Sequence, residues 1–176
     1  MHKGSQGAMS RLDSAIRRLA AQRDCLNHAA GLVAGVDGVV LELGLGNGRT
    51  FDHLRELFPE REIHVFERQV AAHPDCVPTP DRLILGDVEE ALARERARFA
   101  GRVALAHIDL ADGVAATSDR LFAAIAVLLQ PLMAPGGVIV SERELHATQW
   151  TKLSLPRDVA LGRYWLYRAE GRTAAG

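Results

Sequence analysis

Short apolar runs alternate along most of the chain with longer stretches in which hydrophobic residues follow a helical period. The short runs are typical of buried strands, and the longer stretches of amphipathic helices. Strands that alternate with helical crossovers form a parallel sheet with helices on both faces, so the pattern predicts a doubly wound α/β domain. The predicted strands are 39–43, 63–66, 83–85, 103–108 and 138–141, and the predicted helices are 50–58, 88–99 and a long one that ends at 135–137.

A separate apolar stripe precedes this alternation and predicts an extra N-terminal helix in residues 10–34. The stripe can pack on the domain, cover a ligand or bury itself against a second subunit, and it favours a homo-oligomer. Arg23 interrupts the stripe, so its guanidinium either points outward or meets a carboxylate across an interface. The stripe consists of Leu12, Ile16, Leu19, Leu26, Ala30 and Val33.

The end of the chain departs from the alternation of strands and helices. Two β-like runs, 152–155 and 163–168, are joined by a short connection, which predicts an antiparallel hairpin. Residues 1–9 lack an apolar period and predict a flexible leader, and residues 171–176 predict a flexible tail. The α/β domain itself is expected in residues 35–170.

Composition limits the classes of function. The chain has 176 residues and 48% hydrophobic content, which fits one domain with a sizeable core. Its 21 basic and 22 acidic residues give a net charge of −1, so we expect no nucleic-acid partner. The longest apolar stretch, 121–134, is too short and interrupted to span a bilayer, and Cys25 and Cys76 lack metal-ligand spacing. These features favour a cytoplasmic protein without a membrane partner, a disulfide or a metal.

The segment 39–50 carries the strongest functional signal, because a strand runs into a glycine turn and then into a helix. Glycines at 44, 46 and 48 remove β-carbons where the backbone turns sharply and approaches a ligand, and the following helix offers free amides. This arrangement predicts a nucleotide-type cofactor. The dinucleotide fingerprint requires a third glycine at the position of Arg49, which disfavours a nicotinamide or flavin.

The spacing of Glu42, Gly44, Gly46 and Gly48 resembles the first motif of class I S-adenosylmethionine-dependent methyltransferases. The resemblance implies a Rossmann-like fold with a mostly parallel, seven-stranded sheet that ends in an antiparallel hairpin. It also implies that S-adenosyl-L-methionine is the cofactor, and that these four residues and Asn47 belong to its binding site.

Later residues match further motifs of the same family. Glu67 ends the next strand, where the family's acidic residue accepts hydrogen bonds from both ribose hydroxyls, and Arg68 follows it. Gly86, Asp87 and Val88 resemble the third motif, in which the aspartate accepts from the adenine amino group and the next amide meets the ring nitrogen. Asp87 is also a favourable helix N-cap, and the two roles can coexist.

The strand 103–108 leads into the position of the family's fourth motif, beside the methionine end of the cofactor and the substrate. His107 fits a buried, hydrogen-bonded histidine, whereas Asp109 is the better candidate for a cofactor contact and a catalytic base. Other polar residues near the strand ends are Asp112, Glu142 and His146.

The segment 133–137 resembles the family's turn into its fifth strand, with proline ending the helix and glycine capping it. The resemblance covers about 39–168. The amino-acid sequence of the glycine turn further resembles a small bacterial group of methyltransferases without assigned substrates. Metal-dependent catechol-type enzymes place an Asp-Asn pair where Ser141 and Glu142 stand, which argues against a metal. The chain also lacks the Asn/Asp-Pro-Pro-aromatic and Pro-Cys motifs of nucleic-acid and glutamine methyltransferases.

These observations predict a methyltransferase that acts on a small-molecule acceptor by in-line methyl transfer. A non-catalytic protein that binds S-adenosylmethionine or S-adenosylhomocysteine, as a sensor or a degenerate subunit, fits the glycine turn equally well. A nicotinamide reductase is a third interpretation, and it predicts a parallel final strand.

Overall fold

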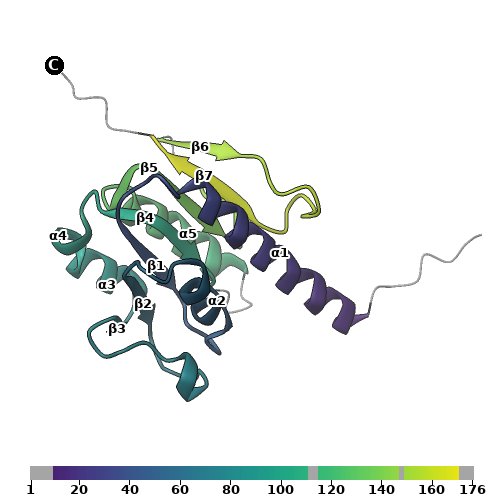
Figure 1. Ribbon diagram of the computed structural model, residues 1–176, viewed down its shortest axis with the longest axis horizontal. Helices are drawn as coiled ribbons and strands as arrows, with labels where there is room; N and C mark the ends of the chain where they lie inside the picture. The colour runs from purple at the N-terminus through teal and green to yellow at the C-terminus, as the bar shows by residue number, and fades with distance from the viewer. Residues whose placement is uncertain (1–9, 111–114, 147–148, 171–176) are drawn as a thin grey trace, which may run out of the picture.

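The computed structural model describes residues 10–110, 115–146 and 149–170. In these residues, seven strands form a single sheet, and helices flank it (Figure 1). The strands are β1 (Val39–Leu43), β2 (Ile63–Glu67), β3 (Leu83–Leu85), β4 (Val103–Ile108), β5 (Met133–Ser141), β6 (Trp150–Leu153) and β7 (Trp165–Ala169). The helices are α1 (Arg11–Leu32), α2 (Arg49–Leu57), α3 (Val88–Arg94), α4 (Arg96–Phe99) and α5 (Ala115–Leu129), with a short 3-10 helix η1 (Pro74–Cys76).

The strand order is β3-β2-β1-β4-β5-β7-β6. Strands β1 to β5 pair in parallel, whereas β7 is antiparallel to both β5 and β6. The doubly wound sheet with an antiparallel ending is therefore confirmed, and the parallel final strand expected of a nicotinamide reductase is not what the sheet contains. The chain changes direction across the sheet between β1 and β4, and ligands of such sheets lie beyond the carboxyl ends of the strands at this point.

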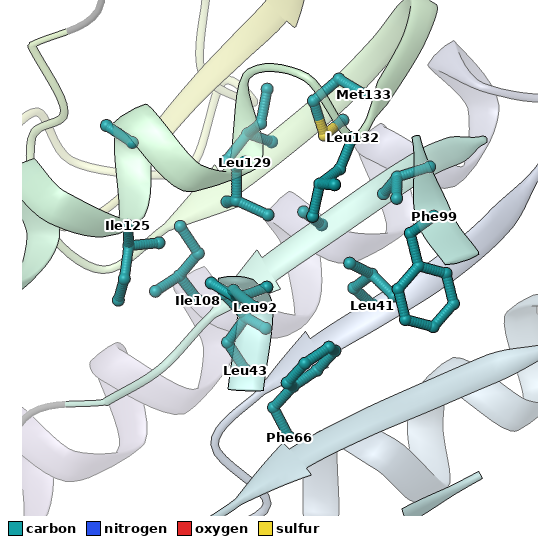
Figure 2. Packing of buried hydrophobic residues seen from close by; sticks show 14 of the residues in the cluster. Leu41, Leu43, Phe66, Leu92, Phe99, Ile108, Ile125, Leu129, Leu132 and Met133 are labelled. Carbon is teal, nitrogen blue, oxygen red and sulfur yellow. The ribbon is translucent and has the colours of Figure 1, made fainter. Parts of the chain in front are cut away.

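The sheet separates two apolar layers. Because these layers cover both faces, the central strands β1 and β4 are buried along their whole length. Helices α1 and α2 cover one face, where Leu26, Leu54 and Leu105 belong to one buried cluster. Helices α3, α4 and α5 cover the other face, where Figure 2 shows Phe66 and Ile125 among the packed side chains.

Helix α1 begins at the N-cap Ser10, whose hydroxyl accepts a hydrogen bond from the amide of Asp13 at 3.0 Å. Its second half packs on the sheet, whereas Leu12 and Ile16 in its first half are 69% and 55% exposed. The first turns extend beyond the sheet (Figure 1). Arg23 pairs with the neighbouring Asp24 at 2.9 Å and is exposed, so its guanidinium points outward from the stripe.

The helix predicted in 88–99 is wrong in one respect, because it is divided into α3 and α4. Glu95 has φ −85° and ψ 4°, which leaves the helical region, and its amide still bonds to the carbonyl of Ala91 at 2.9 Å. The break lets Phe99 turn back into the core, where it is buried.

The Pro135-Gly136-Gly137 segment does not end a helix, because α5 ends at Leu129 and the segment lies inside β5. Val103 pairs with Met133 and Leu105 with Val138, so the segment bulges out of the β4–β5 ladder. A β-carbon on Gly137 would lie 2.7 Å from the carbonyl oxygen of Val103, which explains the glycine there. The hairpin is confirmed with shifted bounds, since β6 begins at Trp150 and β7 at Trp165.

Candidate functional site

The three glycines of the turn after β1 serve different purposes. A β-carbon on Gly44 would lie 2.2 Å from the carbonyl oxygen of Asp109, and one on Gly48 would lie 2.5 Å from the β-carbon of Cys76. These two glycines therefore allow close packing of neighbouring chain segments, and Gly44 also lines the cavities described below. Gly46 has φ +51° and nothing within 4 Å of its missing β-carbon, so it alone leaves open space above the turn.

The carboxylate of Glu67, at the end of β2, is bound by four backbone amides. Oε2 accepts from Leu45 and Gly46 at 2.8 and 3.1 Å, and Oε1 accepts from Arg68 and Gln69 at 2.7 and 3.1 Å. Burial acts to raise the pKa of Glu67, but these hydrogen bonds outweigh it, so the pKa lies below its usual value. The ionised side chain thus fastens the glycine turn to β2.

A cavity of about 290 Å³ lies beside Glu67 and extends along the ends of β1, β2 and β3. Asp87 lines it, and the Asp87 side chain caps α3 by accepting from the amide of Glu89 at 2.9 Å. The N-cap role expected for Asp87 is therefore present in the structure. The wall of this first cavity includes the predicted site residues Glu67, Arg68, Gly86, Asp87, Val88 and Asp109.

A second cavity, of about 230 Å³, lies on the α1 side of the glycine turn. It shares Gly44, Gly46 and Asp109 with the first cavity, so the two meet at the ends of β1 and β4. Its other wall residues are Asn47 and Leu45 from the turn, Arg49 and Thr50 from α2, and Arg18, Leu19 and Gln22 from α1.

Asp109 connects the sheet to α1. The amide of Gln22, which is only 4% exposed, donates to Oδ2 of Asp109 at 2.6 Å. Gln22 is not among the site residues predicted from the sequence, although a signal exists, because it is a polar residue on the same helix face as Leu19 and Leu26. Helix α1 is therefore part of the site rather than only a cover for the core.

Glu42 lies behind the site and lines neither cavity. Its fully buried carboxylate accepts from the Thr50 hydroxyl and lies 2.7 Å from Nδ1 of His107, which is also fully buried. Burial opposes protonation of His107, but the adjacent Glu42 carboxylate, with Asp109 and Glu142 further away, raises its pKa. The structure thus places Glu42 and His107 as a buried pair that supports the start of α2, and Glu42 acts on the site indirectly.

The remaining candidates have separate positions. With its amide oxygen turned toward Arg49, Asn47 accepts from the guanidinium at 3.0 Å. Glu142 accepts from the amide of Leu110 at 2.6 Å, His146 is exposed, and Asp112 lies outside the described residues. Among the residues that the structure describes, no group of three His, Cys, Asp or Glu side chains converges to hold a metal ion.

The largest cavity, of about 510 Å³, is not near these residues. It lies where β2 begins, at the opposite end of the strand from Glu67, and Ile63, Phe51 and Phe58 line it. Its arginines are partly neutralised, since Arg82 pairs with Asp81 at 3.1 Å and Arg55 pairs with Asp52. Position at the strand ends, rather than size, identifies the functional site.

The geometry fits a nucleoside cofactor. Open space above Gly46, the ionised Glu67 beside it and Asp87 further along the same cavity supply a close backbone approach and two carboxylates for hydroxyl and amino groups. The fold and this site together define a Rossmann-like protein of the methyltransferase type.

A family model described as S-adenosyl-L-methionine methyltransferase matches residues 9–169. The chain therefore belongs to this family, and its cofactor is S-adenosyl-L-methionine. No curated protein sequence matches the chain. In the described part of the chain, no helix is long and apolar enough to cross a lipid bilayer.

Solved structures agree with this family. The S-adenosyl-L-methionine methyl transferase from Silicibacter pomeroyi DSS-3 is 44% identical, with a TM-score of 0.87 over 92% of this chain and 99% of that one. SAH-bound PaMTH1 from Podospora anserina is 15% identical, with a TM-score of 0.51 over 93% of this chain and 80% of its own. SAM-bound CalS10 from Micromonospora echinaspora, an amino pentose methyltransferase, is 17% identical, with a TM-score of 0.50 over 89% of this chain and 67% of its own. The two distant structures share the fold.

Proposed function

We propose that this protein catalyses methyl transfer from S-adenosyl-L-methionine to a small-molecule acceptor, as an enzyme of class EC 2.1.1. The observation that carries the proposal is the meeting of two cavities at Gly44, Gly46 and Asp109. The first cavity suits the nucleoside, and the second offers space for an acceptor next to it. When bound, the cofactor supplies an electrophilic methyl group on a sulfonium, and the residues of the chain orient the acceptor for in-line attack.

The proposed cofactor contacts are residues that line the first cavity. Glu67 accepts from the ribose hydroxyls, although its four bonds to backbone amides mean that it shares its oxygens between the turn and the ribose. Asp87 accepts from the adenine amino group, and the amide of Val88 meets the ring nitrogen. Arg68 and Gly86 complete the wall.

Asp109 is the proposed catalytic base. It lines both cavities, and Gln22 fixes its orientation by holding Oδ2 at 2.6 Å. In the proposed reaction, a lone pair of the acceptor forms the new bond to the methyl carbon while the carbon–sulfur bond breaks. Asp109 takes the proton that the acceptor loses, and water can then remove it.

A non-catalytic binding protein is the alternative, and the second cavity argues against it. A sensor needs only the cofactor seat and a responsive surface, whereas an enzyme also needs space for an acceptor beside the reacting end, and the second cavity, which is open to solvent, offers that space. Cytoplasmic location, with no nucleic-acid or membrane partner, completes the proposal and rests on the charge balance and the apolar pattern of the chain.

We also propose a homo-oligomer. The exposed Leu12 and Ile16 continue the stripe whose other end is buried in the domain, and a second copy can cover them. Sedimentation equilibrium measures the mass of the assembly, with Leu12→Ser/Ile16→Ser as the variant expected to shift it to the monomer. A monomeric wild-type protein would refute this part.

Calorimetric titration with S-adenosylmethionine, S-adenosylhomocysteine, NADH and NADPH is the first test. We expect binding of the two methyl-cycle compounds and none of the nicotinamides. Release of S-adenosylhomocysteine in a screen of small hydroxyl, amine and thiol acceptors then separates the enzyme from the sensor. Tight cofactor binding without release of S-adenosylhomocysteine for any acceptor would contradict the proposed enzyme. Full activity of Asp109→Asn would contradict the role of Asp109 as the catalytic base.

A further inference from the structure

The first half of α1 carries an apolar face that the described part of the chain leaves uncovered. Leu12 and Ile16 are exposed, whereas Leu26, further along the same stripe, is fully buried. Leu19 lies between them in the sequence, is half-buried and lines the second cavity. The spacing of Leu12, Ile16 and Leu19 by four and three residues places their side chains on one face of the helix. The exposed face therefore leads to the wall of the second cavity.

The charges beside this face form a self-complementary pattern. Asp13 and Arg17 are both exposed and lie one helical turn apart on the same side of α1. The Asp13 carboxylate accepts from the Ser10 hydroxyl at 2.7 Å, and within the described residues neither Asp13 nor Arg17 forms an ion pair. If two copies of the helix pack antiparallel about a two-fold axis near Ile16, the order of residues is reversed between them, so Asp13 of each copy lies near Arg17 of the other. A parallel pair would instead place the arginines of both copies at the same level, where like charges repel.

The same antiparallel arrangement matches the apolar residues to each other. Leu12 stands four residues before Ile16 and Leu19 stands three residues after it, so Leu12 of one copy lies beside Leu19 of the other. Because Leu19 lines the second cavity, which is open to solvent, Leu12 of a second copy reaches the open edge of this cavity.

We infer that two copies of this chain pair antiparallel through the first half of α1, and that Leu12 of each copy forms part of the acceptor site of the other. This inference rests on the proposed methyl transfer. It adds to the proposed homo-oligomer the arrangement of the two copies and a site that both of them build. A second copy is favoured over a different protein because both the charges and the apolar residues of this face are complementary to themselves.

Disulfide cross-linking tests the arrangement without any acceptor. In a Cys76→Ser background, which removes the partly exposed thiol, Ile16→Cys should cross-link between two copies, because residues at a two-fold axis face each other. Leu12→Cys alone should not, since its two copies lie about 12 Å apart along the helix axis, beyond the reach of a disulfide. A mixture of Leu12→Cys and Leu19→Cys chains should cross-link. His28→Cys, an exposed position near the other end of α1, is the control and should not cross-link.

Mixed dimers test whether the acceptor site is shared, at a concentration at which sedimentation shows dimers of every variant. Leu12→Ala should raise the acceptor KM about tenfold, the effect of losing most of a buried leucine contact, and should leave S-adenosylhomocysteine affinity unchanged, because α1 does not line the first cavity. In a mixture of Leu12→Ala with the inactive Asp109→Asn, the intact Asp109 site receives Leu12 from its neighbour, so the wild-type KM should return. Leu161→Ala, an exposed leucine that lines neither cavity of the site, is the control and should change KM less than about twofold.

Several results would overturn the inference. Cross-linking of Leu12→Cys to itself would show a parallel pair, and no more cross-linking in Ile16→Cys than in His28→Cys would show that the copies do not meet at this face. An unchanged acceptor KM in Leu12→Ala, or a raised KM that persists in the mixture with Asp109→Asn, would show that Leu12 does not serve the neighbouring site. Failure of the wild type to methylate any acceptor would instead refute the proposed function, and the cross-linking would still decide the arrangement of the copies.

Discussion

Substitution of His107 by leucine tests whether the buried pair behind the site stabilises the fold. His107 and Glu42 are fully buried, and Nδ1 lies 2.7 Å from the carboxylate. Leucine removes the imidazole and leaves the Glu42 carboxylate with the Thr50 hydroxyl as its hydrogen-bond donor among the described residues. Removal of one member of a buried ion pair costs about 3–5 kcal/mol, which is a large part of the 5–15 kcal/mol that stabilises a typical domain.

Equilibrium urea denaturation gives the unfolding free energy and its urea dependence. We expect His107→Leu to lower the midpoint strongly. Adding Glu42→Gln should restore at least about 1 kcal/mol, because a neutral amide replaces an unpaired charge and still bonds to Thr50. His146→Leu, an exposed histidine, is the control and should change little.

The pair also predicts a pH dependence with a defined sign. The folded-state pKa of His107 is raised, so its stabilising contribution is complete below the unfolded pKa of about 6.5 and is lost as the pH rises through the folded-state value. The difference in unfolding free energy between the wild type and the Glu42→Gln/His107→Leu variant should therefore shrink toward alkaline pH. A loss of unfolding free energy below about 1 kcal/mol in His107→Leu would refute the reasoning. A difference in unfolding free energy between the wild type and the double variant that grows with pH would refute it as well.

Other predictions concern the glycine turn and the thiols. Glu67→Gln should weaken S-adenosylmethionine binding about 100-fold by calorimetry, since the proposed ribose bonds lose their charge and one acceptor oxygen becomes a donor, and an unchanged affinity would remove Glu67 from the site. Gly46→Ala should block cofactor binding and lower the unfolding free energy by about 1–2 kcal/mol, because its φ is positive. Gly48→Ala should lower the unfolding free energy further, because its β-carbon would lie 2.5 Å from the β-carbon of Cys76. Native protein should expose one reactive thiol to a colorimetric reagent, because burial raises the pKa of Cys25 to about 12 while Cys76 is partly exposed.

The sequence predicted those parts of the site that depend on local order along the chain. Glu67 follows its strand directly, and Asp87 stands at a helix start, so position relative to an element was enough to place each of them at the strand ends. The alternation of strands and helices likewise predicted the doubly wound sheet, and the two β-like runs that follow it predicted the antiparallel ending.

Contacts between distant segments could not be predicted in the same way. Gln22 and Asp109 are separated by 87 positions, and Glu42 and His107 by 65, so their contacts depend on how α1 docks and on which strands are neighbours. The Pro-Gly-Gly segment shows a related limit. Proline and glycine indicate a departure from regular structure, but the pairing of β5 with β4 decided that it is a bulge rather than a helix end.

Helix α1 connects the proposed homo-oligomer with the proposed acceptor site. Its exposed apolar residues lie next to the residues of α1 that line the second cavity. Ile16 lies one helical turn before Leu19, which lines that cavity, and the first cavity contains no residue of α1. If a second copy covers Ile16, it also lies beside Arg18 and narrows the entrance for the acceptor. Ile16→Ser should then raise the acceptor KM while S-adenosylhomocysteine affinity, measured by calorimetry, stays unchanged.

The concentration dependence separates this effect from a local one. Dilution of the wild type below its dissociation constant should reproduce the change seen in Ile16→Ser, because both remove the same neighbour. An acceptor KM that is independent of protein concentration across the assembly transition would show that α1 forms the acceptor wall without help from a second copy.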